Sequence, residues 1–208
     1  MAKVGLDKKY YFIDNSDNVV ISLNKYSNIS SFSEGLAAAE QGDKYGFIDK
    51  TGNPVIPFQF DFASEFTEGL AAVKIKNKFG FIDKTGKMVI PPKYVDGFSI
   101  TEPMGAGSFS EGLACVHIDS KYGFIDKTGN VVIPSKYQDC SIFSEGLAKV
   151  ELNGKVGFID KTGTEVIPFK YLYSYNFKES LAEVATGENF DHRIEFYIDK
   201  KGTEYFEP

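Results

Sequence analysis

The sequence predicts an all-β protein made of tandem repeats, and three observations support this prediction. The chain of 208 residues contains 19 Phe and 12 Tyr but no Trp, and aromatic residues favour strands over helices. Its hydrophobic fraction of 42% and charged fraction of 25% are typical of a folded chain. The third observation is that two short phrases recur along the whole chain, which is the signature of a repeat architecture.

The two phrases keep a constant phase. Phe-Ile-Asp, or a close variant, begins at Phe12, Phe47, Phe81, Phe124, Phe158 and Tyr197. Phe-Ser-Glu-Gly-Leu-Ala, or a variant, begins at Phe32, Phe66, Phe109, Phe143 and Phe177. We therefore predict a single repeat domain over residues 1–208, with units at approximately 1–35, 36–69, 70–112, 113–146, 147–180 and 181–208.

Each unit is predicted to hold three antiparallel strands. Residues 70–76 represent the first strand, in which apolar and polar side chains alternate with the period of a half-buried strand. The second strand contains Gly-Phe-Ile-Asp, and its glycine is expected where an aromatic ring of the next unit packs closely. The third strand contains Val-Ile-Pro, and its proline is expected to end the pairing. The residues that follow can form a fourth short strand or a loop.

The segment Asp-Lys-Thr-Gly between the second and third strands is predicted to be a turn. An aspartate can accept backbone N–H groups two residues on, and glycine supplies the positive φ that closes a hairpin. The alternative is a ring of calcium-binding aspartates, but a calcium loop needs several closely spaced oxygen ligands, and each aspartate here precedes a lysine. The aspartates concerned are Asp49, Asp83, Asp126, Asp160 and Asp199.

The combination of Glu-Gly-Leu-Ala, Lys-aromatic-Gly-Phe-Ile-Asp-Lys-Thr-Gly and Val-Ile-Pro resembles the bacterial WG-repeat (KWG) family. The Trp that gives this family its name is replaced by Tyr45, Phe79, Tyr122 and Val156. The resemblance implies a β-repeat protein with an interaction role, and it implies no catalytic residues.

The ends of the chain bear on the expected architecture. The first unit starts with its first strand and the last unit ends with its third, whereas propellers often close by pairing strands from both ends of the chain. We therefore favour an open, twisted, β-solenoid-like array of three-stranded antiparallel units over a closed, propeller-like ring.

Charge and composition exclude some functions. With 23 basic and 29 acidic residues the net charge is −6, so the chain lacks the electrostatic footprint of a nucleic-acid or membrane-surface binder. No apolar stretch suits a signal peptide or a membrane span, and two cysteines are too few for a disulfide framework. These features favour the cytoplasm, with a removed signal peptide as the alternative.

Irregular positions are the candidates for partner binding. An insertion at residues 95–108 is expected to expose a contact loop, although a tolerated surface insertion is the alternative reading. On the first strand, the position held by Ala38, Ala72, Cys115, Lys149 and Glu183 varies between units and is expected to face outward. The predicted partner-binding residues are Asp96, Phe98, Ile100, Glu102, Met104, Lys149 and Glu183.

No cofactor, metal or catalytic group is predicted. Cys115 and His117 are two residues apart on one strand face, a spacing that can begin a zinc site, but two ligands fall short of four. We predict a non-enzymatic protein–protein interaction module, with a basic partner such as a bacterial effector or toxin that it neutralises in the cytoplasm. The alternative is a carbohydrate-binding repeat protein of the cell surface, which is less favoured because the repeated aromatics flank structural Gly or Pro.

Overall fold

The computed structural model describes residues 2–6, 9–13, 19–22, 25–95, 107–187 and 190–206. These residues form antiparallel strands and one short 3-10 turn, Phe190–His192. The prediction of an all-β protein made of tandem antiparallel sheets is therefore confirmed. The chain divides into two compact units, Met1–Asp96 and Gly97–Pro208.

The first unit contains one three-stranded and two four-stranded sheets. The three-stranded sheet is formed by β1 (Ala2–Leu6), β2 (Lys9–Ile13) and β3 (Val19–Ser22). The next sheet is formed by β4 (Asn28–Ile29), β5 (Ala37–Gln41), β6 (Lys44–Ile48) and β7 (Pro54–Phe60). The last is formed by β8 (Phe62–Ala63), β9 (Leu70–Ile75), β10 (Lys78–Asp83) and β11 (Met88–Tyr94).

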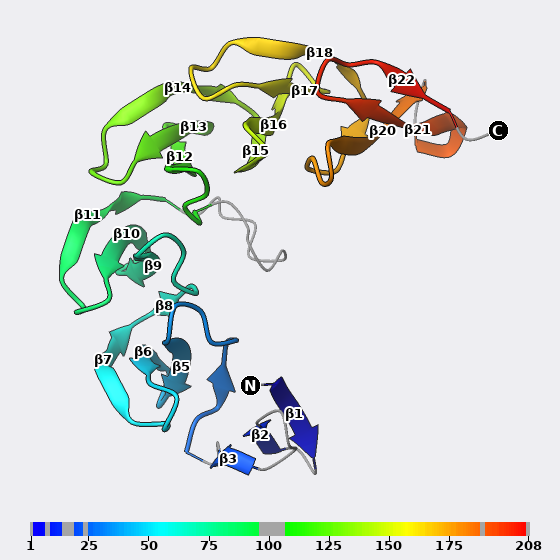
Figure 1. Cartoon of the computed structure of the whole chain (residues 1–208). Helices are drawn as coiled ribbons and strands as arrows, with labels where there is room; N and C mark the ends of the chain where they lie inside the picture. Colours follow the sequence, from blue (N-terminus) through cyan, green and yellow to red (C-terminus); the bar gives the residue numbers. More distant parts are fainter. Residues whose placement is uncertain are drawn as a thin grey trace. The chain divides into compact units, whose positions relative to one another are not determined.

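The second unit has the same plan (Figure 1). Its first sheet is formed by β12 (Leu113–Ile118), β13 (Lys121–Asp126) and β14 (Val131–Tyr137). The second is formed by β15 (Asp139–Ser144), β16 (Leu147–Leu152), β17 (Lys155–Ile159) and β18 (Glu165–Tyr171). The third is formed by β19 (Tyr173–Ser174), β20 (Leu181–Gly187), β21 (Arg193–Asp199) and β22 (Glu204–Tyr205).

The connection whose structure the sequence left open contains a fourth short strand. In the second unit, β15 pairs with β16 and β19 pairs with β20, both antiparallel. Each four-stranded sheet is therefore a meander that takes its first strand from the end of one sequence unit and the other three from the next. The division of the chain into six units within a single domain stays a prediction.

The glycine of the second strand packs against backbone, which corrects the expected contact with an aromatic ring of the next unit. A Cβ atom on Gly46 would lie 2.6 Å from the carbonyl oxygen of Ile56 and 2.9 Å from the nitrogen of Phe58, both on β7. At Gly157 the carbonyl oxygen of Ile167 on β18 would lie 2.8 Å away. At this point the backbone of the third strand lies so close to the second strand that only a glycine fits.

The proline of the third strand does not end the strand, which is a second correction. β18 continues through Pro168 to Tyr171. The register shifts between the pair Val156–Tyr171 and the pair Phe158–Ile167, so β18 bulges around the glycine of β17. Because a bulge leaves a residue outside the ladder, a proline, which lacks an N–H group, is accommodated there.

The Asp-Lys-Thr-Gly turn is confirmed. In the second unit, the Oδ1 atom of Asp126 accepts the Thr128 N–H at 2.9 Å, the Thr128 hydroxyl at 2.7 Å and the Asn130 N–H at 3.0 Å. Gly129 has a φ of 87°. The hydrogen bond from the Thr128 hydroxyl lowers the pKa of Asp126. Oxygen Oδ1 of the corresponding aspartate accepts the same two backbone N–H groups in the other turns, at Asp49, Asp83, Asp160 and Asp199.

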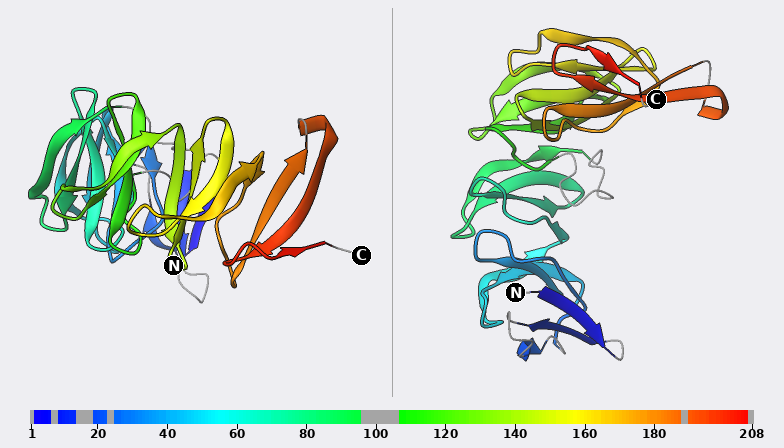
Figure 2. Two further views of the ribbon diagram at one scale, coloured as in Figure 1. Left: turned by 90° about the horizontal axis from the view of Figure 1, so that it is seen from above. Right: turned by 45° about the vertical axis from the view of Figure 1, so that its right-hand side comes forward.

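In the second unit the sheets follow one another along the chain (Figure 2), and successive sheets share a hydrophobic core. One core contains Leu113, Phe124 and Ile133 of the first sheet and Phe143, Ala148 and Val150 of the second. Another contains Leu147, Phe158 and Ile167 of the second sheet and Phe177, Ala182 and Val184 of the third. The middle sheet of this unit is thus covered on both faces.

This packing corrects the expectation that one face of the first strand points outward. Ala38, Ala72 and Cys115 are 2%, 3% and 0% exposed, respectively. Because these three side chains are buried, the difference between Ala and Cys at this position reflects contacts inside the protein.

We predict that Gly157→Ala lowers the free energy of unfolding by about 2–3 kcal/mol, because its new methyl group would overlap the backbone of β18. Gly146→Ala is the matched control. Gly146 has a φ of 89° but nothing within 4 Å of the added carbon, so only the conformational cost of about 1 kcal/mol applies. Urea unfolding followed by circular dichroism measures both, and equal losses would contradict the close-approach explanation.

We also predict an acid-dependent loss of stability from the turn aspartates. Hydrogen bonds from Thr162 lower the pKa of Asp160 in the folded state. Stability from this group is therefore present above the unfolded pKa of about 3.9 and is lost as the pH falls through the lower, folded pKa. In Asp160→Asn, the free energy of unfolding should change less between pH 6 and pH 3 than in the wild type. An unchanged pH dependence in urea titrations would argue against this role.

Candidate functional site

The phrase Phe-Ser-Glu-Gly forms a two-residue hairpin turn. In the second unit, Glu145 and Gly146 have φ values of 53° and 89°, and Ser144 pairs with Leu147 across the turn. Positive φ at both central residues is the mark of a type I′ turn. A glutamate is uncommon in this conformation, so its recurrence in every such turn calls for a reason.

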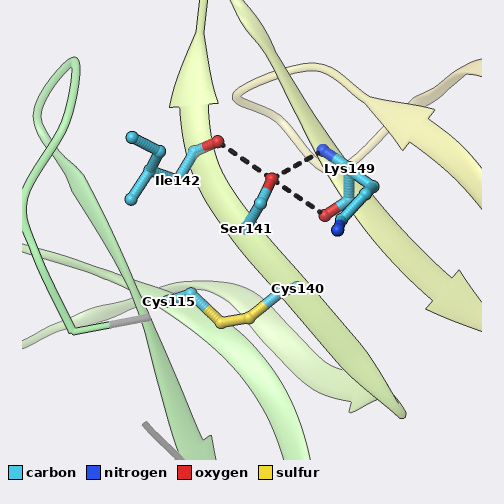
Figure 3. The surroundings of a disulfide bond; sticks show 5 residues. All are labelled: Cys115, Cys140, Ser141, Ile142 and Lys149. Carbon is cyan, nitrogen blue, oxygen red and sulfur yellow. Dashed lines mark hydrogen bonds between the residues drawn. A yellow bond between two sulfur atoms is a disulfide. The ribbon is translucent and has the colours of Figure 1, made fainter. Parts of the chain in front are cut away.

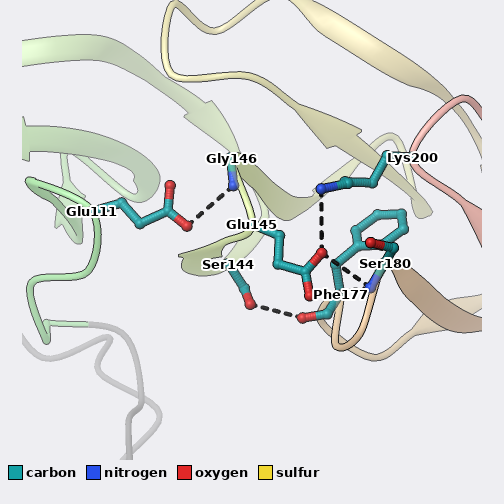
Figure 4. A network of polar contacts seen from close by, with 7 residues as sticks. All are labelled: Glu111, Ser144, Glu145, Gly146, Phe177, Ser180 and Lys200. Carbon is teal, nitrogen blue, oxygen red and sulfur yellow. Dashed lines mark hydrogen bonds and ion pairs between the residues drawn. The ribbon is translucent and has the colours of Figure 1, made fainter.

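The reason is a set of polar contacts between successive turns, which we call the turn-to-turn contact (Figure 4). The Glu145 carboxylate accepts the Ser180 N–H at 3.1 Å and pairs with Lys200 at 3.2 Å. The Ser144 hydroxyl donates to the Phe177 carbonyl at 2.7 Å. The hydrogen bond from the Ser180 N–H, followed by the contact with Lys200, lowers the pKa of Glu145.

The turn-to-turn contact recurs in both units. Glu111 accepts the Gly146 N–H at 3.1 Å and pairs with Lys161 at 2.9 Å. In the first unit Glu34 accepts the Gly69 N–H at 3.0 Å and pairs with Lys84 at 3.2 Å. The lysine of Asp-Lys-Thr-Gly therefore links neighbouring sheets.

An aromatic pair accompanies each turn-to-turn contact. The phenylalanine that opens the turn packs on the phenylalanine of Phe-Ile-Asp in the preceding sheet. The ring centroids of Phe158 and Phe177 are 4.8 Å apart, and those of Phe124 and Phe143 are 5.0 Å apart. Each sheet thus contacts the Phe-Ser-Glu-Gly turn of the next sheet in two ways. Its apolar face packs on the phenylalanine, and its own turn forms hydrogen bonds with the backbone.

The third sheet of the second unit has this same face uncovered. Leu181 and Tyr197 are 40% and 37% exposed. Their counterparts one sheet earlier, Leu147 and Phe158, are 8% and 0% exposed because β19–β22 covers them. Within the described residues of the second unit, no further sheet follows β19–β22 along the chain.

A hollow of about 430 Å³ lies on this face and is the candidate binding site. We call it the terminal hollow, and it is lined by Tyr175, Asn176, Lys178, Glu179, Leu181, Glu183 and Tyr197. Beside Glu183, the hydroxyl of Tyr173 donates to Glu195 at 2.6 Å, and Arg193 contacts the same carboxylate at 2.6 Å. Burial and the hydrogen bond to Glu195 raise the pKa of Tyr173 to about 12.

The structure places two of the predicted partner-binding residues. Lys149 and Glu183 occupy equivalent positions, opposite Phe158 and Tyr197 in their sheets. Both are half-buried, and only Glu183 lines the terminal hollow. The other predicted residues, Asp96, Phe98, Ile100, Glu102 and Met104, lie outside the described residues.

Sequence reasoning missed the other residues of the terminal hollow. The available signal was that the last turn departs from the repeat. Lys178 stands where the other turns have Ser or Thr, and Ser180 stands where they have Gly. Tyr197 replaces the phenylalanine of Phe-Ile-Asp. These changes fall on the face that is covered by the following sheet earlier in the second unit.

The two cysteines form a disulfide between β12 and β15, two neighbouring sheets of the second unit (Figure 3). Their Cα atoms are 6.4 Å apart, within the usual range for a disulfide. Cys115 is thus not available to begin a zinc site with His117. Over the described parts of the chain, no group of three or more His, Cys, Asp or Glu side chains is arranged to hold a metal ion.

In the ranges that the structure describes, no helix has the length and apolar character needed to cross a membrane.

Stacked antiparallel meanders joined through their turns define a tandem β-repeat protein. The sequence matches the model of the WG-containing repeat over residues 12–45, 45–79, 79–122, 122–155 and 157–190. The chain belongs to the WG-containing repeat family, so the resemblance seen in the sequence is confirmed.

Solved structures show the same fold. A eukaryotic initiation factor is 13% identical, with 97% of this chain and 61% of that chain covered and a TM-score of 0.62. Hsv2p of Kluyveromyces lactis is 10% identical, with 96% and 80% covered and a TM-score of 0.52. The chain thus spans 61% of the length of the initiation factor structure. At these identities the likeness shows the fold alone. A search of curated proteins finds no match.

We predict that reduction of the disulfide lowers the free energy of unfolding by about 3 kcal/mol, because it releases a cross-link between residues 25 apart in sequence. The control is the double variant Cys115→Ala/Cys140→Ala. Alanines already pack at the equivalent positions, Ala38 and Ala63, in the first unit. Urea unfolding of this variant should be insensitive to reductant. Two titratable thiols in the unreduced wild type would contradict the prediction.

Proposed function

We propose that this protein is a non-enzymatic module that binds another protein through the terminal hollow. One observation carries the proposal. The residues equivalent to Leu181 and Tyr197 in the preceding sheet are buried against protein. A surface with the same chemistry, but open, is suited to a polypeptide ligand. Its uncovered Leu and Tyr side chains also form the kind of apolar patch, rimmed by charges, that marks interaction sites.

We propose that the partner is basic at the point of contact, as a bacterial effector or toxin with basic patches would be. Glu179 and Glu183 both line the terminal hollow. In the earlier turns the glutamate equivalent to Glu179 pairs with a lysine from the following sheet. The net charge of −6 supports the same choice of partner.

The compartment stays a proposal. The sequence favours the cytoplasm, whereas the disulfide between Cys115 and Cys140 favours an oxidising compartment, where such bonds persist. We propose that the protein works in an oxidising compartment. Two free thiols in material isolated from its natural source under thiol-blocking conditions would contradict this proposal.

Carbohydrate binding is the second candidate, favoured by the exposed Tyr175 beside Tyr197 in the terminal hollow. A sugar platform that used the repeat itself would need exposed aromatics at regular intervals. The repeated rings of Phe47, Phe124 and Phe158 are 0% exposed. We therefore favour protein binding over carbohydrate binding, because the repeated rings are buried and cannot contact a sugar.

The test is affinity capture from cells that naturally contain this protein, with the wild type, Leu181→Arg and Val166→Arg as baits. Leu181 and Val166 are exposed to a similar extent, 40% and 39%, but Val166 does not line the terminal hollow. We expect a protein that is retained by the wild type and Val166→Arg, and lost with Leu181→Arg. Retention by all three baits, or glycan-array binding without a protein partner, would contradict the proposal.

A further inference from the structure

We propose that the terminal hollow binds a hairpin turn of the Phe-Ser-Glu-Gly type from a different polypeptide, so that this protein extends its stack of sheets with a foreign one. The inference rests on the proposed function and names the chemistry of the partner. It starts from the fact that the chain itself shows what covers such a face.

The apolar part of the hollow matches a phenylalanine. One sheet earlier, the face made by Leu147 and Phe158 receives Phe177 from the next turn, with ring centroids of Phe158 and Phe177 4.8 Å apart. On the last sheet the same positions are Leu181 and Tyr197, both exposed and both lining the hollow. An aromatic side chain that enters here would complete the same pair.

The polar part matches the backbone of a turn. Glu145 accepts the backbone N–H of Ser180, and Ser144 donates to the carbonyl of Phe177. On the last sheet these two positions are Glu179 and Lys178, and both are exposed. Glu179 can accept an N–H from an incoming turn, and the Lys178 ammonium can donate to its carbonyl, as the Ser144 hydroxyl does. A lysine on the partner, equivalent to Lys200, would then pair with Glu179.

A second copy of this chain is a poor source for that turn, because its own turn phenylalanines are already packed. Phe32 packs on Phe12, and Phe66 packs on Phe47, both with centroids 4.7 Å apart. Phe143 and Phe177 pack on Phe124 and Phe158, and Phe109 is 2% exposed. A partner with an unpacked Phe-Ser-Glu-Gly turn fits without loss of any of these contacts.

The experiment is an NMR titration of the isotope-labelled full chain with a backbone-cyclised peptide that reproduces residues 141–151. We expect saturable shifts at the amides of Glu179, Leu181 and Glu183. The dissociation constant should be weak, on the order of 0.1–1 mM, because a single turn supplies a small contact area. The same peptide with the equivalent of Phe143 replaced by alanine should produce no shift at these amides.

Two protein variants complete the test. Leu181→Arg should weaken binding about tenfold or more, because it removes an apolar contact and inserts a charge. Val166→Arg should bind like the wild type, and thermal unfolding establishes that both are folded. Absence of shifts at millimolar peptide, or equal shifts from both peptides, would overturn the proposal. So would self-association that Leu181→Arg abolishes, since a second copy would then be the occupant.

The two proposals fail separately. A captured protein that Leu181→Arg loses, together with no response to the peptide, would leave the proposed function standing and remove only the assignment of the turn. Loss of both the capture and the peptide response would remove both proposals.

Discussion

The structure depends on one constraint, which is that both faces of an inner sheet must be covered by its neighbours. A small meander cannot bury enough apolar surface alone, so its stability comes largely from the sheets before and after it. In the second unit, Leu147, Phe158 and Ile167 on one sheet and Phe177, Ala182 and Val184 on the next fill a single core. The recurring residues of the sequence are those that supply the two sides of this core.

The turn-to-turn contact gives this apolar stacking a defined register. Apolar faces alone tolerate sliding, whereas a carboxylate that must meet one backbone N–H and one lysine fixes the offset between sheets. Glu145 meets both Ser180 and Lys200, and Glu111 meets both Gly146 and Lys161. The left-handed conformation of the glutamate, which is uncommon for this residue, is what directs its side chain to the next turn.

The periodic part of this architecture could be predicted from the sequence. Alternation, turn chemistry and the phase of the two phrases predict strands, hairpins and tandem sheets, and the Asp126 turn has the predicted hydrogen bonds. The contacts between sheets could not be predicted, because alternation has the same appearance whether the second face meets solvent or another sheet. Cys115, expected to face outward, is 0% exposed, and its partner Cys140 lies on a strand that the sequence left open.

The same limit applies to the candidate site. The terminal hollow is made by residues whose counterparts are core, so the alternation of apolar and polar residues does not mark Leu181 or Tyr197 as exposed. The available signal is the departure from the repeat at Lys178, Ser180 and Tyr197. Glu183 was predicted as a variable outward position, and it lines the hollow because no sheet of the second unit lies beyond β19–β22 among the described residues.

The bulge at the proline of the third strand affects how the molecule meets other chains. The third strands β7, β11, β14 and β18 lie at sheet edges, and each carries an exposed proline at Pro57, Pro91, Pro134 or Pro168. A proline in a bulged edge offers no continuous row of donors, so another strand cannot add to the ladder there. Uncontrolled lateral aggregation is thereby discouraged at these edges, while addition of a sheet face to face stays open.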